Sequence, residues 1–262
     1  MLRNLRLLLP AALLALAAPL AAQDLPRDPP GAGDLAVMGT IPIYWGEHGE
    51  FSDLLSGGEG SGHWARPVIE QTYRLRPLDY LSADALRGHT RLLLAQPRGL
   101  SAEENVALDA WVRGGGRLLL FADPLMTGHS EFALGDRRRP QDTALLSPIL
   151  GHWGLELRFD ETQGEGRQLR VQTGDGVPPA LPVDQAGHFA MLGTASECAL
   201  LGEGLIAECR LGSGFAVIVA DAALLDSDAP DDDALSAFTA LLQRISGNHV
   251  PLPVSDIGGG SK

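Results

Sequence analysis

The chain has 262 residues, of which 45% are hydrophobic and 20% are charged. This composition is typical of a globular protein that is long enough to bury a sizeable core. The formal net charge of -13 argues against a nucleic-acid partner, because binding to phosphates relies on Lys and Arg side chains. A basic run at 137–139 lies beside Asp136 and Pro140, and we interpret it as a solvated loop rather than an anion site.

The first 22 residues are typical of a secretory signal peptide. Arg3 and Arg6 precede an apolar stretch over 7–20, and Ala21 and Ala22 supply small side chains before the expected cleavage point. The stretch is shorter than the roughly 20 residues that span a bilayer, so we expect cleavage, with retention as an anchor as the alternative. The sequence therefore predicts export to the periplasm.

Three further segments follow the leader. A linker over 23–34, rich in Pro and Gly, is predicted to be disordered. It precedes a single α/β domain over 35–248, and a flexible tail over 249–262 ends the chain.

The domain is predicted to begin with a buried strand over 35–44, although Pro42 has no N–H for the ladder. A Gly-rich stretch over 56–62 follows. A helix over 64–71 and a short strand over 73–78 come next.

The middle of the chain predicts a strand, a helix and a second strand. Apolar strands are expected at 91–95 and 117–121. Ser101 and Glu104 form a capping box at the start of the helix, and the glycines at 114–116 end it. Its inward face is expected to consist of Val106, Ala110 and Trp111. Two continuous apolar strands joined by a helix indicate a parallel crossover.

The later elements complete the pattern. A helix over 143–153 and a strand over 155–159 are followed by loops and short antiparallel strands over 160–196. A β-prone strand covers 215–220. The last helix follows the acidic run at 231–233, ends at Gly247 and shares one apolar face of Leu235, Phe238, Leu241, Leu242 and Ile245. This order predicts an α/β fold, an open and mainly parallel sheet with helices on both faces and a β-hairpin excursion.

The two cysteines, Cys198 and Cys209, flank a Gly-Glu-Gly turn. If Glu203 and Gly204 form a two-residue loop, counting outward places the cysteines directly opposite each other, at a hydrogen-bonded pair. We expect a disulfide in an oxidising compartment. The alternative is two reduced, buried thiols.

In open α/β sheets, ligands bind beyond the carboxyl ends of the strands. Residues just after the predicted strands are therefore candidates for binding a small polar ligand: Trp45, Glu47, Gln96, Arg98, Asp123 and Asp221. The alternative for Asp123 and Asp221 is that their carboxylates accept backbone hydrogen bonds and cap the segments that follow.

No catalytic, metal or cofactor site is predicted. The position expected for a nucleophile elbow carries Asp123 and Pro124 rather than Ser or Cys between small residues. The histidines lack ligand spacing, and the run at 226–231 lacks the glycine of a calcium loop. No glycine-rich phosphate loop follows any strand.

Residues 92–104 and 108–124 resemble the extracytoplasmic domain of gliding-motility-type auxiliary components of uncharacterised ABC transport systems. Residues 212–214 and 217–221 are similar to the late strand of that group. The resemblance implies a flavodoxin-like sheet related to class I glutamine amidotransferases but without their catalytic Cys. It also implies a role beside a membrane transporter.

Two functions follow. The first is a non-catalytic periplasmic binding or scaffolding domain, whose partner is a membrane transporter or another envelope protein. The second is an amidotransferase-like hydrolase with a non-standard carboxylate site drawn from Glu47, Asp123 or Asp221.

Overall fold

The computed structural model describes residues 33–46, 62–130, 132–133, 135–171, 178, 180–193, 197–227 and 229–246. The predicted leader and tail lie outside these ranges, as do most of the predicted linker, most of the Gly-rich stretch, Glu47 and Gly247.

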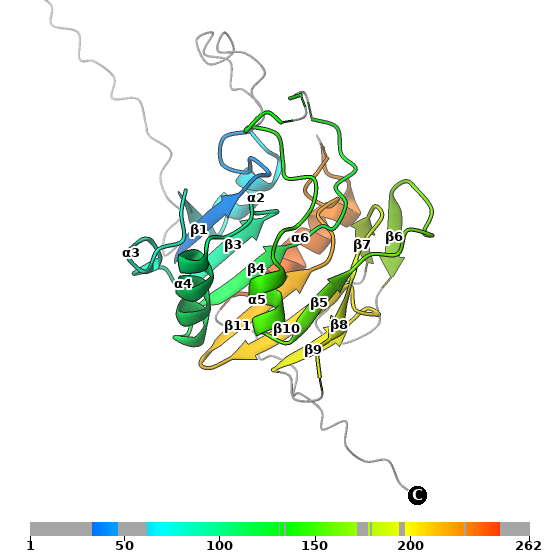
Figure 1. Cartoon of the computed structure of the whole chain (residues 1–262). Coiled ribbons are helices and arrows are strands. Elements are labelled where there is room, and N and C mark those ends of the chain that lie inside the picture. Colours follow the sequence, from blue (N-terminus) through cyan, green and yellow to red (C-terminus); the bar gives the residue numbers. More distant parts are fainter. Residues whose placement is uncertain are drawn as a thin grey trace, which may run out of the picture.

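One seven-stranded sheet forms the centre of the fold (Figure 1). In spatial order its strands are β2 (Tyr73–Pro77), β1 (Gly33–Gly39), β3 (Arg91–Ala95), β4 (Arg117–Phe121), β11 (Gly214–Val219), β10 (Ile206–Leu211) and β9 (Cys198–Leu201). The first five run parallel, and β10 and β9 are antiparallel to their neighbours. Numbered along the chain, the parallel strands have the order 2-1-3-4-5, which is that of a flavodoxin-like sheet. The open, mainly parallel α/β fold is confirmed.

The central strands are buried because helices cover both faces of the sheet. In β3 and β4 the four residues after the initial Arg are all fully buried, and every residue of β11 is buried. Strands covered on both sides require continuous apolar runs, and these three sequences supply them. β1 ends at Gly39, so Pro42 lies beyond the ladder to which it could not donate.

Figure 1 shows α4 and α5 on one face of the sheet and α2 and α6 on the other, which confirms helices on both faces. The helices are α2 (Ala65–Glu70), α3 (Ala83–Leu86), α4 (Ala102–Arg113), α5 (Ser147–His152) and α6 (Asp232–Arg244). The capping box of Ser101 and Glu104 is present at the start of α4. α5 is shorter than predicted, and Pro148 lies in its first turn, where proline is favoured.

The predicted inward face of α4 is wrong. Val106 is 71% exposed, and Ala110 is exposed as well. Leu108 and Val112 are fully buried instead, together with Glu104. These three positions recur every four residues and form one stripe. Trp111, the third residue of the predicted face, is half-buried beside this stripe.

The predicted excursion over 160–196 contains three short strands, β6 (Gln168–Val171), β7 (Ala180–Val183) and β8 (His188–Met191), in two small antiparallel sheets. One sheet pairs β6 with β7, and the other pairs β8 with β5 (Leu155–Arg158), the strand that was predicted before the excursion. Among the helices that the structure describes, none is long and apolar enough to cross a bilayer.

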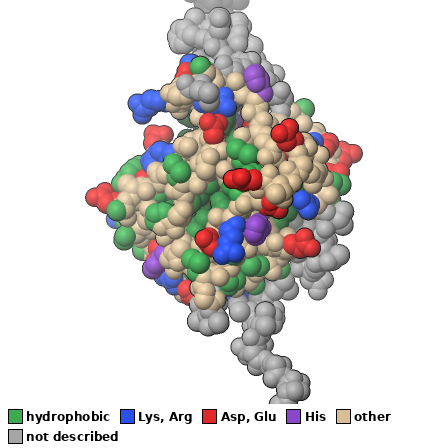
Figure 2. Space-filling model, turned by 45° about the vertical axis from the view of Figure 1, so that its right-hand side comes forward, with side chains coloured by type: hydrophobic (Ala, Val, Ile, Leu, Met, Phe, Trp, Pro, Cys, Tyr) green, Lys and Arg blue, Asp and Glu red, His purple; other side chains and the backbone are tan. Residues whose placement is uncertain are grey.

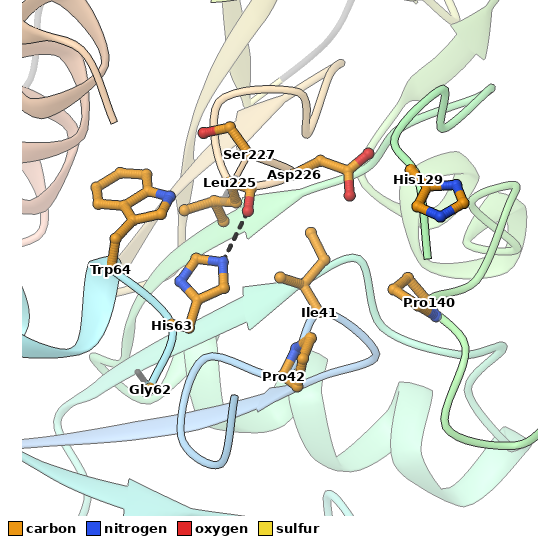
Figure 3. A pocket seen from close by; sticks show the side chains of 10 residues that line it. All are labelled: Ile41, Pro42, Gly62, His63, Trp64, His129, Pro140, Leu225, Asp226 and Ser227. Carbon is orange, nitrogen blue, oxygen red and sulfur yellow. Dashed lines mark hydrogen bonds between the residues drawn. The ribbon is translucent and has the colours of Figure 1, made fainter. Parts of the chain in front are cut away.

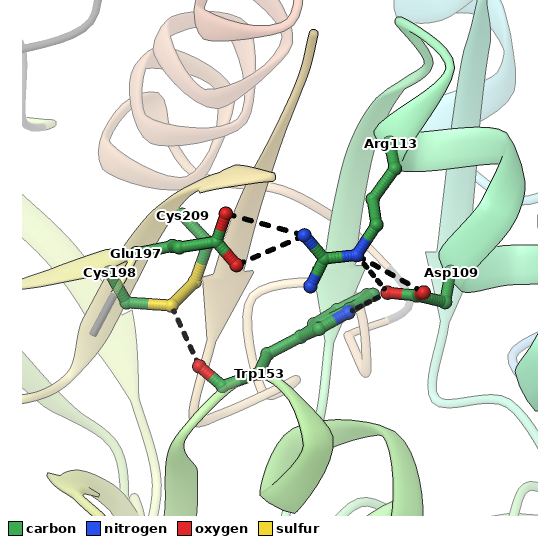
Figure 4. Close-up of a disulfide and its surroundings, with 6 residues drawn as sticks. All are labelled: Asp109, Arg113, Trp153, Glu197, Cys198 and Cys209. Carbon is green, nitrogen blue, oxygen red and sulfur yellow. Dashed lines mark hydrogen bonds and ion pairs between the residues drawn. A yellow bond between two sulfur atoms is a disulfide. The ribbon is translucent and has the colours of Figure 1, made fainter. Parts of the chain in front are cut away.

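The disulfide between Cys198 and Cys209 is confirmed, and it joins β9 to β10 with the two residues directly opposite. Beside it, Arg113 of α4 pairs with Glu197 and Asp109 (Figure 4). The expected hydrogen-bonded position is wrong, because the N–H of Arg210 donates to Glu197 O (2.7 Å) and makes that neighbouring pair the hydrogen-bonded one. The turn spans 202–205 rather than two residues, which shifts the alternation along the ladder.

Candidate functional site at the carboxyl edge of the sheet

The carboxyl ends of β1, β3, β4 and β11 meet at one edge of the sheet, where ligands bind in folds of this type. Three predicted residues lie just beyond these ends: Gln96 after β3, Asp123 after β4 and Asp221 after β11. All three side chains are at most 1% exposed. They therefore lie under the edge and do not form an open surface.

Gln96 ties together the segments that leave three strands. Its Oε1 accepts from the N–H of Asp123 (2.8 Å), and its Nε2 donates to the carbonyls of Asp123 (3.0 Å) and Gln141 (2.9 Å). Its own carbonyl accepts from Thr40 Oγ1 (2.5 Å), just after β1. Since each polar group of the amide has a partner, the side chain supports the edge and has no group left for a ligand.

Asp123 and Asp221 hold backbone in the same way. Asp123 accepts from the N–H groups of Leu125 and Ala222, both at 2.8 Å. Asp221 accepts from those of Asp184 (3.0 Å) and Ala223 (2.8 Å). This arrangement agrees with the alternative given for both residues, in which the carboxylates accept backbone hydrogen bonds and cap the segments that follow.

The two carboxyl groups bind protons more tightly than free Asp side chains do. Burial raises the pKa of Asp123 to about 6, against the two backbone hydrogen bonds and with a further contribution from Asp184. Burial also raises the pKa of Asp221 well above its usual value, and the charge of Asp123 adds to this shift. Buried acids of like charge favour the protonated form.

Arg98 and Trp45 are not brought to this cluster. Arg98 forms a two-pronged ion pair with Glu104 (2.8 and 2.9 Å) and donates to Asp79 O (3.2 Å). Burial alone would raise the pKa of Glu104, but hydrogen bonds from Arg98, Ser101 and Leu81 outweigh it and lower the pKa to about 2. Arg98 therefore anchors the start of α4. Trp45 is 67% exposed and packs its ring edge-on against Tyr44.

The strained strand-to-helix turn lies at a different residue from the expected one. Gln96 is one of three non-glycine residues with positive φ in the described chain, at 46°, and it joins β3 to the loop before α4. A nucleophile elbow requires a strained turn between a strand and a helix, and Gln96 rather than Asp123 has such a backbone conformation. Sequence alone did not reveal this, because a residue before proline, here Pro97, normally favours extended backbone. The amide at this turn is not a nucleophile.

A pocket of about 220 Å³ opens at the same edge of the sheet (Figure 3). Its lining comes from segments that are distant in sequence: Ile41, Pro42, Gly62, His63, Trp64, His129, Pro140, Leu225, Asp226 and Ser227. These residues follow β1 and β11, precede α2, or belong to the connection between β4 and α5. None of these residues is among those predicted from the sequence, since a loop position carries no periodic signal.

His63 forms a fixed, neutral part of this pocket. One ring nitrogen, Nδ1, accepts from the N–H of Ala65 (3.1 Å), so Nε2 carries the proton and donates to Leu225 O (2.7 Å) (Figure 3). Burial lowers the pKa of His63, and the bond to Leu225 opposes this only in part. With both nitrogens engaged, the imidazole links the start of α2 to the segment after β11.

The side chains at the surface have mixed charges. On the face that Figure 2 shows, Lys and Arg side chains are scattered among acidic ones, and no basic patch is seen there among the described residues. The same part of the chain holds no group of three His, Cys, Asp or Glu side chains that could bind a metal ion.

Comparison with solved structures supports the fold. The chain is similar to the mmIFT52 N-terminal domain, with a TM-score of 0.54 and 12% identity over 83% of this chain and 100% of that one. Weaker matches include a putative GMP synthase protein from Thermoplasma acidophilum, with a TM-score of 0.46 and 10% identity over 82% of this chain and 94% of that one. A third is the β-galactosidase from Rahnella sp. R3, with a TM-score of 0.44 and 14% identity over 82% of this chain and 31% of that one.

At these identities the likeness to solved structures extends to the fold alone. No curated protein sequence matches the chain. A family model described as "ABC-type uncharacterized transport system" matches residues 59–190, which is half of the chain. The protein therefore belongs to this family, the auxiliary components of uncharacterised ABC-type transport systems.

Proposed function

We propose that this auxiliary component is a non-catalytic binding or scaffolding domain that serves its transporter from the periplasmic side of the membrane. The observation that carries the proposal is Gln96. The strained turn after β3, where a nucleophile would be presented in a related enzyme, holds an amide whose polar groups all support backbone. The protein then acts through what it binds.

The periplasmic location has two sources of support. Residues 1–22 have the pattern of a cleavable leader. The disulfide between Cys198 and Cys209 is of a kind that persists in oxidising compartments and is rare in the cytosol.

The same proposal includes a relationship between this chain and the class I glutamine amidotransferases, whose catalytic Cys the chain is proposed to lack. The strand order 2-1-3-4-5 and the left-handed turn at Gln96 support it. The family name itself supports only a role beside a transporter.

The competing hypothesis is a hydrolase that uses Glu47, Asp123 or Asp221. Glu47 lies outside the described residues, and the raised pKa of Asp123 is the feature that favours this hypothesis. Geometry argues against the use of Asp123 or Asp221. Each of these two carboxylates is about 1% exposed and accepts two backbone N–H groups, so neither faces a space that a substrate could enter.

The test is affinity purification of the tagged full-length chain from detergent-solubilised envelopes, followed by mass spectrometry. We expect it to enrich the permease or ATP-binding component of an ABC transporter over a control bait that carries the same leader. We also expect the tagged chain in the periplasmic fraction.

A screen of the purified protein for hydrolase activity tests the competing hypothesis. An activity abolished by Asp123→Asn or Asp221→Asn, while Glu161→Gln retains it, would refute the non-catalytic role. Glu161 is an exposed carboxylate and serves as the control.

A further inference from the structure

Most arginines that are buried or half-buried in the described chain have a carboxylate partner. The ion pairs are Arg66 with Glu70, Arg74 with Asp34, Arg98 with Glu104, Arg113 with Asp109 and Glu197, Arg139 with Asp142, and Arg244 with Glu208. Within the same part of the chain the exceptions are Arg91 and Arg117, which are half-buried and pair with no carboxylate. Since the sequence has 33 acidic and 20 basic residues, a shortage of acids does not explain these exceptions.

The two arginines without a carboxylate are neighbours at the amino edge of the sheet. Arg91 is the first residue of β3 and Arg117 is the first residue of β4, and the two are register partners. Adjacent strands lie about 4.8 Å apart, and residues in register point to the same face of a sheet. Two positive charges therefore lie on one face, at the opposite end of these strands from the pocket.

The end of α6 holds Arg117 in place. Its Nε donates to Ile245 O (3.0 Å) and its Nη2 donates to Arg244 O (3.1 Å). The two carbonyls orient the guanidinium group but carry no full charge that would neutralise it. Burial lowers the pKa of Arg117, and the positive charge of Arg91 lowers it further, against a smaller opposing effect of Tyr73. A bound anion would relieve the repulsion between the two like charges.

Arg91 is held by Tyr73 of β2 and by Thr90. Its guanidinium carbon lies 5.4 Å from the centre of the Tyr73 ring, and its Nη1 donates to Thr90 Oγ1 (3.2 Å). Its Nε is buried and has no partner, so a ligand cannot reach that atom. Nη2 of Arg91 and Nη1 of Arg117 make no hydrogen bond within the described chain, and neither is one of its buried polar atoms. Each guanidinium group therefore keeps N–H groups that can donate to a ligand.

The two guanidinium groups restrict the chemistry of that ligand. A phosphate monoester carries a charge of about −1.5 to −2 at pH 7 and three strong acceptor oxygens, which matches two positive charges with N–H groups from two strands. Guanidinium groups bind phosphate oxygens through short, charge-assisted hydrogen bonds. A carboxylate has a single charge, and it would neutralise only one of the two arginines.

We propose that Arg91 and Arg117 bind the phosphate group of a phosphate ester at the amino edge of the sheet. The inference goes beyond the proposed scaffolding role and does not depend on it. The phosphate group can belong to a soluble ester or to a lipid headgroup, and the experiment distinguishes the two sources.

Isothermal titration calorimetry of the full chain with sn-glycerol 3-phosphate tests the site. We expect saturable binding with one ligand per chain. The affinity is expected to fall several-fold from pH 7.5 to pH 5, because the second pKa of a phosphate ester is about 6 and both arginines stay charged over this range. Acetate, which carries one charge, is expected to bind at least tenfold more weakly than the phosphate ester.

Three variants locate the binding. Arg91→Gln and Arg117→Gln are each expected to weaken the binding of glycerol 3-phosphate at least tenfold. Arg170→Gln is the matched control, because Arg170 is exposed on β6 and its substitution removes the same charge. This control is expected to stay within twofold of the wild type. Arg117→Gln also removes the bonds to the end of α6 and can unfold the chain, whereas Arg91→Gln loses one side-chain hydrogen bond and keeps the test decisive.

Cosedimentation with vesicles separates the two sources of phosphate. The vesicles consist of phosphatidylcholine with or without phosphatidic acid, whose headgroup is a phosphate monoester. Retention that requires phosphatidic acid and is lost in Arg91→Gln assigns the site to a lipid headgroup. Binding of glycerol 3-phosphate in the calorimeter without retention on vesicles assigns it to a soluble ester.

The inference is overturned if glycerol 3-phosphate shows no saturable binding and the vesicles show no retention that depends on Arg91. It is also overturned if acetate binds as tightly as the phosphate ester, or if Arg170→Gln weakens binding as much as Arg91→Gln does. In each of these cases copurification with a transporter component would still support the scaffolding role, so the two proposals fail separately.

Discussion

Gln96 shows how one side chain can fix the geometry of a whole sheet edge. Its amide reaches from the end of β3 to backbone groups at Asp123 and Gln141, which lie 27 and 45 residues further along the chain. The positive φ of Gln96 is a conformation that non-glycine residues adopt only where the surroundings compensate. Three side-chain hydrogen bonds provide that compensation here.

Gln96→Ala is expected to lower the free energy of unfolding by about 2–4 kcal/mol, because it leaves the N–H of Asp123 and the carbonyl of Gln141 without partners and removes one of the two donors to the carbonyl of Asp123. Urea denaturation followed by circular dichroism measures the change. Gln163→Ala is the matched control, since Gln163 is half-buried and donates one hydrogen bond, to Ala186 O. An equal loss in both variants would contradict the role given to Gln96.

Gly39 is required for a different reason, the close approach of β1 to β3. A Cβ atom at this position would overlap the backbone of Ala95, so Gly39→Ala is expected to destabilise the protein by about 1–3 kcal/mol through strain. Gly151→Ala is the control. Gly151 lies exposed in α5 with open space around its Cα, and this change is expected to stabilise the protein by up to about 1 kcal/mol.

Thermal melts of both glycine variants measure these effects: the melting temperature is expected to fall for Gly39→Ala and to rise for Gly151→Ala. A melting temperature for Gly39→Ala equal to that of the wild type would show that β1 and β3 can separate without cost.

At the scale of elements, the disulfide is the covalent link between β9 and β10. Closing a loop with a sequence separation of 11 lowers the conformational entropy of the unfolded chain. This loss stabilises the folded state by about 3 kcal/mol. The double variant Cys198→Ser, Cys209→Ser is expected to unfold at correspondingly lower urea concentration. Dithiothreitol should lower the stability of the wild type to that of the double variant and leave the variant unchanged. If dithiothreitol destabilises both proteins equally, the bond is not the cause.

Elements were predictable from sequence where one local rule dominated. The strands β3 and β4 were predicted with their observed bounds, because continuous apolar runs between Arg and a turn have few alternatives. The capping box at Ser101 placed the start of α4 as well. The inward face of α4 and the bounds of α5 were missed, since both depend on which neighbours cover a surface, and one sequence window does not contain that information.

At the scale of the whole molecule, the edge that carries the pocket was predictable and its lining was not. The alternation of strands and helices implies which strand ends meet, and Gln96, Asp123 and Asp221 were found there. Whether a side chain faces a ligand or braces the backbone depends on contacts between distant segments. Trp64 and Asp226 lie 162 positions apart in the chain and line one pocket.

The pair Asp123 and Asp221 connects this edge to the pH dependence of stability. The pKa of Asp123 is about 6 in the folded protein and about 3.9 in an unfolded chain. Between these values the folded state binds more protons, so the contribution of Asp123 to stability falls as pH rises. Asp221 acts in the same direction because its pKa is also raised. His63 acts in the opposite direction below about pH 6.5, because its pKa is lowered.

The difference in unfolding free energy between the wild type and Asp123→Asn removes the contribution of His63, which is equal in both proteins. It keeps the contribution of Asp123 together with the part of the Asp221 shift that the charge of Asp123 causes. Asn cannot titrate, so this difference is expected to fall by as much as about 3 kcal/mol as pH rises from 4 to 7.5. Urea denaturation at intervals of half a pH unit measures it, and the same series with the exposed Glu161→Gln provides the baseline. A difference that stays constant or grows with pH would mean that Asp123 is ionised in the folded protein at all these values. In that case the two backbone hydrogen bonds would outweigh the effect of burial on the pKa of Asp123. The charged carboxylate would then stabilise the folded protein.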